Sequence, residues 1–297
     1  MSSLQKTIDI LNAFSPNEPE LTAATIAEKL SIPIPTIYRI LASLTKAGLL
    51  EKKVGKGTYV IGRTLYTLGS LYLSTTDLYQ AAEPVLHTVN DITGEVTNLS
   101  ILDDKGYITM LLREESKHPL RHVVHVGSSA PAYTRASGKA LLSALTDEEI
   151  DRLYPEEKIT QFTSKTVATR AELKRELEQA REKGFAFNSE QAFEGIEAVA
   201  SVIRNARGNV IAAIAISAPV VRMNEVRRKK FASLVQIGAG LISYRLGYQD
   251  NPQPIQRVDE LYVWWQQQSQ PNEILQSDAD LNAGESDNGI TSEKQLT

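Results

Sequence analysis

The sequence of 297 residues has no cysteine, four histidines, two tryptophans and no long uninterrupted apolar stretch. The lack of cysteine excludes disulfide bonds, thiolate metal sites and cysteine nucleophiles. No apolar run approaches the roughly 18 residues that a membrane-spanning helix needs, and the first ten residues lack the apolar core of a signal peptide. We therefore expect a cytoplasmic protein with no membrane partner, and the 42% of hydrophobic residues suffice for about two globular domains.

The net charge of −4 is distributed unevenly along the chain. Residues 1–63 hold eight cations and five anions, and between Lys29 and Arg63 only Glu51 is negative. The segment from Asp250 to the end carries nine acids against two cations, while the middle of the chain is neutral. A basic N-terminal block beside a neutral body is what a phosphate-facing module requires, although a run of lysines is also compatible with a solvated surface.

The basic block has the pattern of three helices. Apolar residues recur at helical spacing from Leu4 to Phe14, and Thr22 is placed to cap a second helix. Pro35 stands where a third helix begins, and Gly48 is a natural left-handed stop. One face of the third helix is apolar and is expected to pack, whereas the opposite face is free to meet the major groove of DNA. The expected DNA-contacting residues of this helix are Thr36, Tyr38, Arg39, Ser43 and Lys46.

Residues 49–61 form two short strand-like runs around a turn of glycine and lysine, which predicts a hairpin. Lys53 and Lys56 lie near its tip and are expected to contact phosphates. Three helices followed by a basic hairpin is the order of a winged helix-turn-helix domain. The alternative is a small helical domain whose Arg39 and Lys46 merely face the solvent.

The rest of the chain predicts an α+β fold with an antiparallel sheet, because strands and helices do not alternate strictly. Capping patterns at Thr146 and Thr169 open two helices, and Pro84 is expected to bend a helix over residues 78–91. The strand-like runs cover residues 96–102, 107–112, 121–126, 198–204 and 210–216.

Two patterns in this region suggest chemistry and fail on inspection. Ser137, Gly138 and Lys139 resemble part of a phosphate-binding loop, but Tyr133 stands where a glycine is required and Ala140 stands where a magnesium-binding hydroxyl is required.

Three histidines between positions 118 and 125 crowd one segment. If residues 121–126 form a strand, His122 and His125 point to opposite faces and cannot hold one ion together. We therefore predict no metal site, no cofactor and no catalytic residue.

A binding pocket is the other function open to this region, because a sensor of small molecules needs a few polar groups inside an apolar cavity. The run from Tyr133 to Gly138 opens a helix, whose first backbone N–H groups and dipole favour a carboxylate. We therefore expect a small organic acid as the ligand. Helix capping and tight packing explain Ser137, Gly138 and Ser217 equally well.

Four stretches, in the family's order over residues 4–250, resemble the IclR-type (isocitrate lyase regulator) transcription factors. They read IAEKLSIPIPTIYRILASLTKAGLLEKKVGKGTYVIG, YTRASGKALL, REKGFAFNSEQAFEGIEAVASVIRNARGNVIAAIAISAP and LISYRLGY. With this resemblance we expect a winged helix-turn-helix domain over residues 1–62, a linker helix over 63–77, a GAF/PAS-like effector and oligomerisation domain over 78–250, and an acidic, mostly disordered tail over 251–297.

The resemblance implies a homodimer, often paired into a homotetramer, that binds a pseudo-palindromic operator in double-stranded DNA. We expect it to repress a catabolic operon under the control of a small organic acid. The implied effector-binding residues are Thr134, Ala136, Ser137, Gly138, Asn188, Ser189, Ala198, Ala215 and Ser217.

The chain departs from the family in both sites. Ile34 and Pro35 replace a Lys-Ser pair that commonly opens the recognition helix, which leaves the preferred DNA site open. Where related regulators carry Asp, Cys and Ser, this chain has Asn188, Ala198 and Ala215. The ligand of those relatives therefore does not transfer to it.

Two segments have open interpretations. Residues 62–72 form either the linker helix that pairs protomers or an ordinary core helix of the first domain. Trp264 and Trp265 lie in a short apolar patch ahead of residues 270–297, whose composition predicts disorder. This patch either docks on the body or on another subunit, or forms a transient helix.

The alternative function is that of a metabolic enzyme that acts on a small acid. Its N-terminal block would then be a protein-interaction module. No nucleophile, base and orienting acid stand in a recognisable local pattern, although a triad dispersed along the chain is compatible with the sequence.

Overall fold

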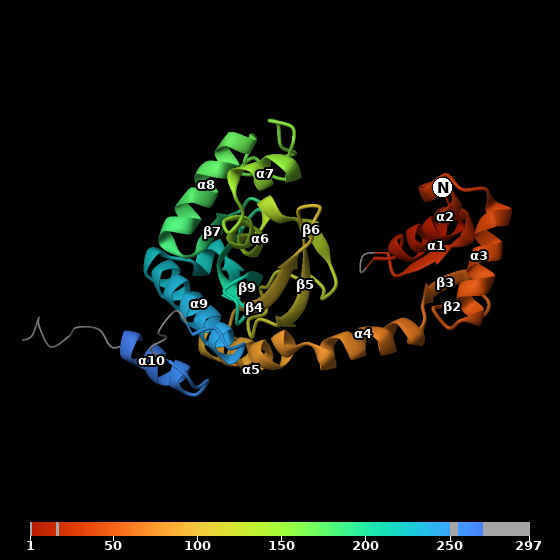
Figure 1. Ribbon diagram of the computed structural model, residues 1–297. Coiled ribbons are helices and arrows are strands. Elements are labelled where there is room, and N and C mark those ends of the chain that lie inside the picture. The colour runs from red at the N-terminus through yellow and green to blue at the C-terminus, as the bar shows by residue number, and fades with distance from the viewer. Residues whose placement is uncertain (1, 16–17, 250–254, 270–297) are drawn as a thin grey trace, which may run out of the picture.

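The computed structural model of the protein describes residues 2–15, 18–249 and 255–269. It shows two folded units, an N-terminal unit and a larger body, joined by a single helix (Figure 1). In the part of the chain that is described, no helix is long and apolar enough to cross a membrane. The N-terminal unit and the connection consist of α1 (Ser3–Asn12), β1 (Glu20–Thr22), α2 (Ala23–Leu30), α3 (Ile34–Lys46), β2 (Leu50–Lys52), β3 (Thr58–Ile61) and α4 (Arg63–Thr75).

The N-terminal unit is a winged helix-turn-helix, as the sequence predicts. Thr22 caps α2 by accepting a hydrogen bond from the backbone N–H of Thr25, and Ser31 ends the helix in the left-handed conformation. The predicted apolar stripe of α3 is buried, while β1, β3 and β2 form a small antiparallel sheet in that order. In α1 it is Ile10 that is fully buried, whereas Leu4 and Ile8 of the predicted apolar pattern are exposed.

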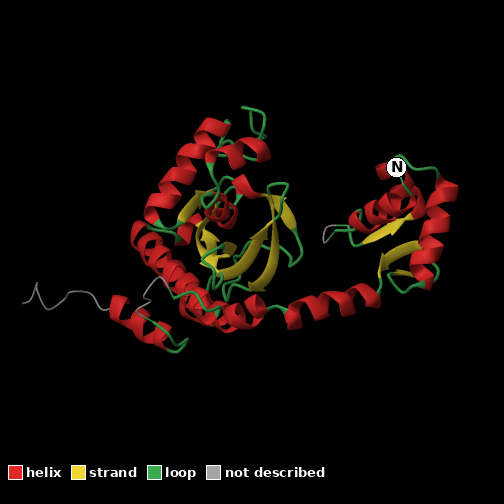
Figure 2. Cartoon of the chain, in the orientation of Figure 1, coloured by secondary structure: helices red, strands yellow, loops and turns green. Residues whose placement is uncertain are grey.

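The body is built on a six-stranded antiparallel sheet with the order β6-β5-β4-β9-β8-β7. Figure 2 shows this sheet in yellow, surrounded by helices. The predicted strand-like runs over residues 96–102 and 107–112, and over 198–204 and 210–216, pair as two hairpins, and Gly94 closes α5 in the left-handed conformation. The elements of the body are α5 (Asp77–Thr93), β4 (Val96–Leu102), β5 (Tyr107–Glu114), β6 (Ser129–Pro131), the 3-10 helix η1 (Ala132–Thr134), α6 (Ala136–Leu142), α7 (Asp147–Leu153), α8 (Arg170–Lys183), β7 (Ala186–Ser189), β8 (Ile196–Arg204), β9 (Val210–Pro219), η2 (Val220–Arg222), α9 (Glu225–Arg245) and α10 (Glu260–Ser269).

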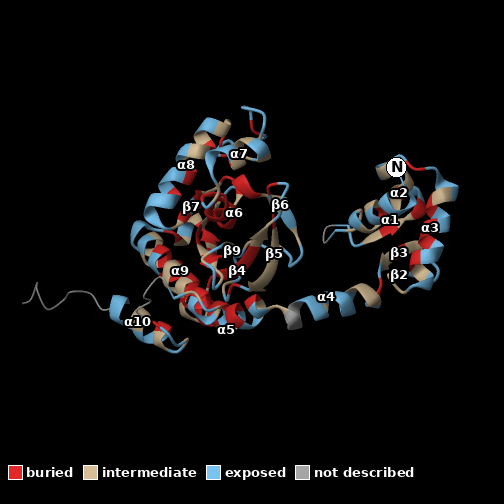
Figure 3. Ribbon diagram, in the orientation of Figure 1, coloured by how far each residue is buried: buried red, intermediate tan, exposed pale blue. Residues whose placement is uncertain are grey.

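The two faces of this sheet carry residues of different size. Large side chains such as Ile214 and Ile216 pack toward α5 and α9. The alternate positions, including Ala200, Ala213 and Ala215, face α6 and the elements around it. Figure 3 shows buried segments in both layers of the body. Because successive side chains of a strand point to opposite faces, the alanines leave room on the α6 side of the sheet.

The predicted strand over residues 121–126 is wrong. The residues alternate between exposed and half-buried, as in a strand, but they join no ladder. Backbone pairing with β5 resumes only at Gly127 and Ser128, which bond to Met110, and continues in β6. The carbonyl of His122 is instead satisfied by the guanidinium of Arg113. The alternation of exposed and half-buried residues here belongs to an extended segment that pairs with no strand of the described chain.

α4 is not a core helix of the N-terminal unit, because Tyr66, Leu68 and Leu71 on it are exposed. It begins directly at the wing. A methyl group on Gly62 would lie 2.2 Å from the carbonyl oxygen of Gly48, so this junction requires glycine.

The apolar patch of the tail forms α10 and packs on α5 and α9. Leu261 is fully buried there, and Trp264 and Trp265 pack against the main core. The side chain of Tyr262 donates a hydrogen bond to Asp91 of α5 at 3.1 Å. Docking on the body is thus the observed arrangement, while residues 270–297 lie outside the described residues.

Candidate DNA-binding surface and ligand pocket

The outer face of α3 is positively charged and open to solvent. Tyr38, Arg39, Ser43 and Lys46 are exposed there, and Thr36 is half-buried. The side chain of Ser43 donates a hydrogen bond to the backbone carbonyl of Arg39 at 3.2 Å. Neither Arg39 nor Lys46 forms an ion pair with any described residue. Because the inner face of the same helix is anchored in the core, these cations are held outward on a rigid support.

The lysines of the wing differ in their surroundings. Lys56 is exposed at the turn between β2 and β3. Lys53 pairs with the carboxylate of Glu20 at 2.8 Å, and Glu20 also accepts a hydrogen bond from Thr58. The bonds from Lys53 and Thr58 hold the pKa of Glu20 below its usual value. Lys53 is therefore less available to a phosphate than Lys56.

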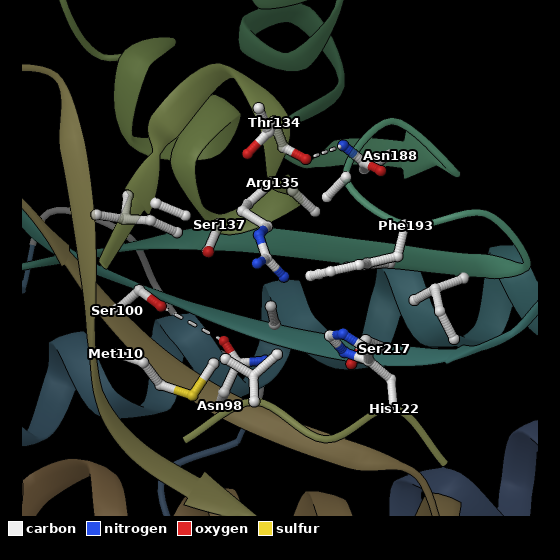
Figure 4. A pocket seen from close by; sticks show the side chains of 18 of the residues that line it. Asn98, Ser100, Met110, His122, Thr134, Arg135, Ser137, Asn188, Phe193 and Ser217 are labelled. Atoms are coloured by element: carbon white, nitrogen blue, oxygen red, sulfur yellow. Dashed lines mark hydrogen bonds between the residues drawn. The ribbon is translucent and has the colours of Figure 1, made fainter. Parts of the chain in front are cut away.

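A cavity of about 650 Å³, including its mouth, lies on the small-residue side of the sheet (Figure 4). Its walls come from the central strands, from the start of α6 and from the loops around residues 122–128 and 192–196. The register of β7, β8 and β9 sets Asn188 beside Ala198 and Ala198 beside Ser217. Seven of the nine effector residues predicted from the sequence line this cavity, namely Thr134, Ala136, Ser137, Asn188, Ala198, Ala215 and Ser217.

The other two predicted residues lie outside the cavity wall. A methyl group on Gly138 would lie 2.0 Å from the carbonyl oxygen of Ala132, so this glycine allows η1 and α6 to cross closely. Ser189 donates its hydroxyl hydrogen bond to Glu197 at 2.9 Å.

Asn188 lines the cavity, but its amide is already engaged. Its Nδ2 donates to the carbonyl of Thr134 at 2.8 Å, and its Oδ1 accepts from the backbone N–H of Gln191 at 3.3 Å. The bond to Thr134 ties β7 to η1, just ahead of α6. Asn188 thereby shapes the cavity more than it offers free donors to it.

The sequence reasoning missed several wall residues. Arg135 stands between Thr134 and Ala136, two residues that the sequence does predict. Asn98 and Ser100 are polar residues at alternate positions of a strand whose other residues, apart from Thr97, are apolar, a signal that could have found them. The wall residues that were missed and that matter for chemistry are Asn98, Ser100, Met110, Arg113, His122, Arg135 and Phe193.

Two arginines line the cavity, and among the described residues one has a carboxylate partner and one does not. Arg113 is almost fully buried and binds the carboxylate of Glu115 with two hydrogen bonds, at 2.9 and 3.3 Å. Arg135 has no carboxylate partner among the described residues. Its guanidinium carbon lies 4.4 Å from the centre of the Phe193 ring. Burial, together with the charge of Arg113, lowers the pKa of Arg135 to about 10, so it stays protonated at neutral pH.

His122 completes this part of the cavity. Its ring lies 4.1 Å from that of Phe193, and the two planes are tilted by 47°. Burial, and then the charges of Arg135 and Arg113, lower the pKa of His122 to about 4. The imidazole is therefore neutral at pH 7, and it adds no charge to the two arginines.

The lysine of the rejected phosphate-loop pattern is enclosed. Lys139 is buried on α6, and its amine donates hydrogen bonds to Glu176 and Gln191. Burial lowers the pKa of Lys139, while Glu176 opposes this shift. Within the described ranges, no group of three or more His, Asp or Glu side chains is arranged to hold a metal ion.

A winged helix-turn-helix with outward cations, linked by one helix to a separate domain that encloses a ligand-sized cavity, defines a class of DNA-binding regulators. Comparisons with known proteins agree with this class. The family described as bacterial transcriptional regulator IclR C-terminal matches residues 70–244, and the IclR helix-turn-helix domain matches residues 3–53.

Similar proteins extend the agreement over most of the chain. The HTH-type transcriptional repressor AllR of Salmonella typhimurium is 31% identical over 245 residues, which are 82% of this chain and 90% of that protein. The crystal structure of an IclR transcriptional regulator from Alicyclobacillus acidocaldarius has a TM-score of 0.75 at 22% identity and covers 82% of this chain and 98% of its own.

A third relative carries a ligand. The structure of an IclR homologue from Microbacterium hydrocarbonoxydans, complexed with 4-hydroxybenzoate, has a TM-score of 0.72 at 23% identity and covers 82% of this chain and 99% of its own. The chain belongs to the IclR family of bacterial transcriptional regulators. It is a DNA-binding regulator, and the enzyme hypothesis finds no support in the family or in these relatives.

Proposed function

We propose that the chain represses transcription by binding as a homodimer to a pseudo-palindromic operator, and that a small organic acid controls this binding. The observation that carries the proposal is the pair of uncompensated cations, Arg39 and Lys46, on the outer face of a helix whose inner face is buried. The relative from Salmonella typhimurium is a repressor, which supports repression as the outcome.

In this proposal the recognition helix α3 enters the major groove and the wing lies on the backbone. Arg39 has the planar donors that read a guanine edge, and Lys46 and Lys56 neutralise phosphates. Thr36, Tyr38 and Ser43 supply further contacts along the groove, and Lys53 joins them once it leaves Glu20.

The effector is proposed to bind in the cavity of the body, with Gly138 and Ser189 supporting the wall from outside. The 4-hydroxybenzoate bound by the Microbacterium hydrocarbonoxydans relative supports a small acid as the class of ligand. An effector that binds one arrangement of the two DNA-binding units better than another changes the affinity for the operator. A catabolic operon is the expected target, because its substrate or product is then the signal.

The division of the chain follows from this proposal. Residues 1–62 bind DNA, residues 63–77 connect and pair protomers, residues 78–250 bind the effector and assemble, and residues 251–297 form the acidic tail. The exposed apolar side chains of Tyr66 and Leu68 on α4 support pairing of two protomers along this helix, as a dimer or within a tetramer. The site of action is the cytoplasm, where the DNA is.

The test is fluorescence anisotropy with the DNA upstream of the chain's own gene, at several salt concentrations. We expect specific binding that weakens steeply with salt, and release by at least one member of a panel of organic acids. A scrambled DNA of equal length is the control. Equal affinity for both DNAs at every salt concentration would refute the proposal.

A further inference from the structure

We infer that the effector is a monoanion and that its single carboxylate binds the guanidinium of Arg135, which makes Arg135 the residue that sets the charge of the ligand. This inference rests on the proposed function and deepens it, because it names the ligand's charge and the group that reads it.

The wall of the cavity holds few charged groups. Arg113, His122 and Arg135 are the titratable side chains of its wall, and no Asp or Glu belongs to the described residues that line it. Arg113 is paired with Glu115 through two hydrogen bonds, and Arg121 also approaches this carboxylate, at 3.6 Å. His122 is uncharged at neutral pH because of its low pKa. Among the described residues of the wall, Arg135 is therefore the charged side chain without a carboxylate partner.

The partly buried charge of Arg135 is costly without a counter-ion. A guanidinium that is partly removed from water without a counter-ion is unfavourable, and a carboxylate ligand removes this penalty. The planar fork of arginine matches a carboxylate with two parallel hydrogen bonds. A second carboxylate on the same ligand would lose its hydration and find no cation in return. A neutral ligand would leave Arg135 unpaired.

Polar and aromatic side chains surround the guanidinium of Arg135. Figure 4 shows Arg135 pointing into the middle of the cavity, with Ser137, Ser100 and Asn98 on one side and Phe193 and His122 on the other. The Ser100 hydroxyl and the Asn98 amide contact each other only at 3.5 Å, so both keep capacity for a ligand. The chemical class that fits is a small monocarboxylate with a neutral hydroxyl or carbonyl group.

The experiment measures binding by isothermal titration calorimetry to the full chain at pH 7, using matched probes. One series is 4-hydroxybenzoate, 4-hydroxybenzamide and terephthalate, and the other is lactate, lactamide and malonate. In each series the probes carry one, no and two negative charges. In at least one series we expect the monocarboxylate to bind about tenfold or more tightly than both of its counterparts, since hydrogen bonds to charged groups are the stronger ones.

Three variants sharpen the test. Arg135→Gln should lose the preference for the monocarboxylate over the amide, and Arg135→Lys should keep part of it. Glu115→Gln leaves the charge of Arg113 uncompensated, so it should improve binding of the dicarboxylate by about tenfold. This gain of binding requires a folded protein, which protects the test against variants that merely unfold.

The outcomes separate this inference from the proposed function. Binding of an amide or a dicarboxylate as tight as that of every monocarboxylate overturns the inference, as does a panel in which no monocarboxylate binds, or an Arg135→Gln protein with an unchanged preference. The proposed function survives these results if an organic acid still releases the operator. Conversely, Arg135-dependent binding of a monocarboxylate that never affects DNA affinity supports the inference and refutes the proposed control of DNA binding.

Discussion

Arg39 and Arg135 are the same side chain in two opposite environments. Arg39 lies in water on the outer face of α3, next to other cations of the N-terminal unit, whereas Arg135 points into a cavity of the body. In water and salt, one exposed charge contributes little, so a surface that binds phosphates needs several of them. In the cavity a single charge acts strongly on a bound anion, because few other groups and little solvent screen it. On the exposed surface of α3 the number of cations determines how well phosphates are bound. In the cavity it matters whether a cation already has a carboxylate partner.

The largest effect is expected from Gly138→Ala, which should damage the enclosed site and spare the exposed one. The new methyl group would lie 2.0 Å from the backbone of Ala132, and backbone cannot move aside cheaply. We expect the free energy of unfolding of the body to fall by about 3 kcal/mol, with loss of ligand binding. Chemical denaturation and calorimetry measure both effects. Gly69→Ala on α4 is the control, because its methyl meets no atom of the same chain.

The next effect belongs to the exposed site. Arg39→Ala should weaken operator binding by about 1–3 kcal/mol and relax the preference at one base pair, if the guanidinium reads a base edge. Competition with operators changed at single positions measures both quantities. Arg207→Ala, an exposed arginine in the turn between β8 and β9, should bind like the unaltered protein. Unchanged affinity and preference in Arg39→Ala would mean that α3 is not the reading helix.

A smaller effect on DNA affinity is expected from the wing lysines, and it depends on whether each lysine is paired with a carboxylate. Lys56→Ala should flatten the plot of log affinity against log salt by about one unit, because one phosphate is no longer neutralised. Lys53→Ala should flatten it less, because Glu20 already compensates Lys53. Glu20→Gln should steepen it. Anisotropy titrations at four salt concentrations give these slopes, and equal slopes for the two lysine variants would show that the ion pair does not persist in solution.

An effect that is absent at neutral pH concerns proton binding by His122. Its pKa in the folded protein is about 4, below the ordinary 6.5, because the cavity is buried and positively charged. Between these pH values the unfolded chain binds a proton that the folded chain does not, so His122 lowers stability as the pH falls from 6.5 toward 4. In His122→Asn this part of the acid destabilisation should be missing. Urea denaturation at pH 7.0, 5.5 and 4.5 compares the two proteins, and parallel losses would contradict the assignment.

Local patterns made much of the fold predictable from the sequence. The stripe of α3, the wing hairpin, the caps at Thr22 and Thr146, and the hairpin of β8 and β9 each depend on residues close in the chain. The segment 121–126 shows the limit of such patterns. Its alternation is that of a strand, but a strand also needs a partner, and only the folded chain shows which neighbour β5 accepts.

The candidate site was predictable in part for the same reason. Thr134, Ala136 and Ser137 belong to a single motif, but the role of Arg135 between them depends on distant residues. Arg113 finds its partner Glu115 only two residues along the chain, but the lack of a carboxylate beside Arg135 among the described residues depends on every segment that lines the cavity. The bond between Lys53 and Glu20 likewise joins residues 33 positions apart in the sequence. The sequence alone does not show which charged side chains of different helices and strands pair with one another.

The junction at Gly62 determines how motion reaches the DNA. Gly62 packs closely against the carbonyl of Gly48. The hydroxyl of Thr64 donates a hydrogen bond to the carbonyl of Ala47. No flexible residue therefore separates α4 from the wing in this described stretch of the chain. A rotation of α4 about its own axis must therefore swing the recognition helix through the same angle. In the proposed dimer, a turn of this connecting helix would change how the two recognition helices face the operator.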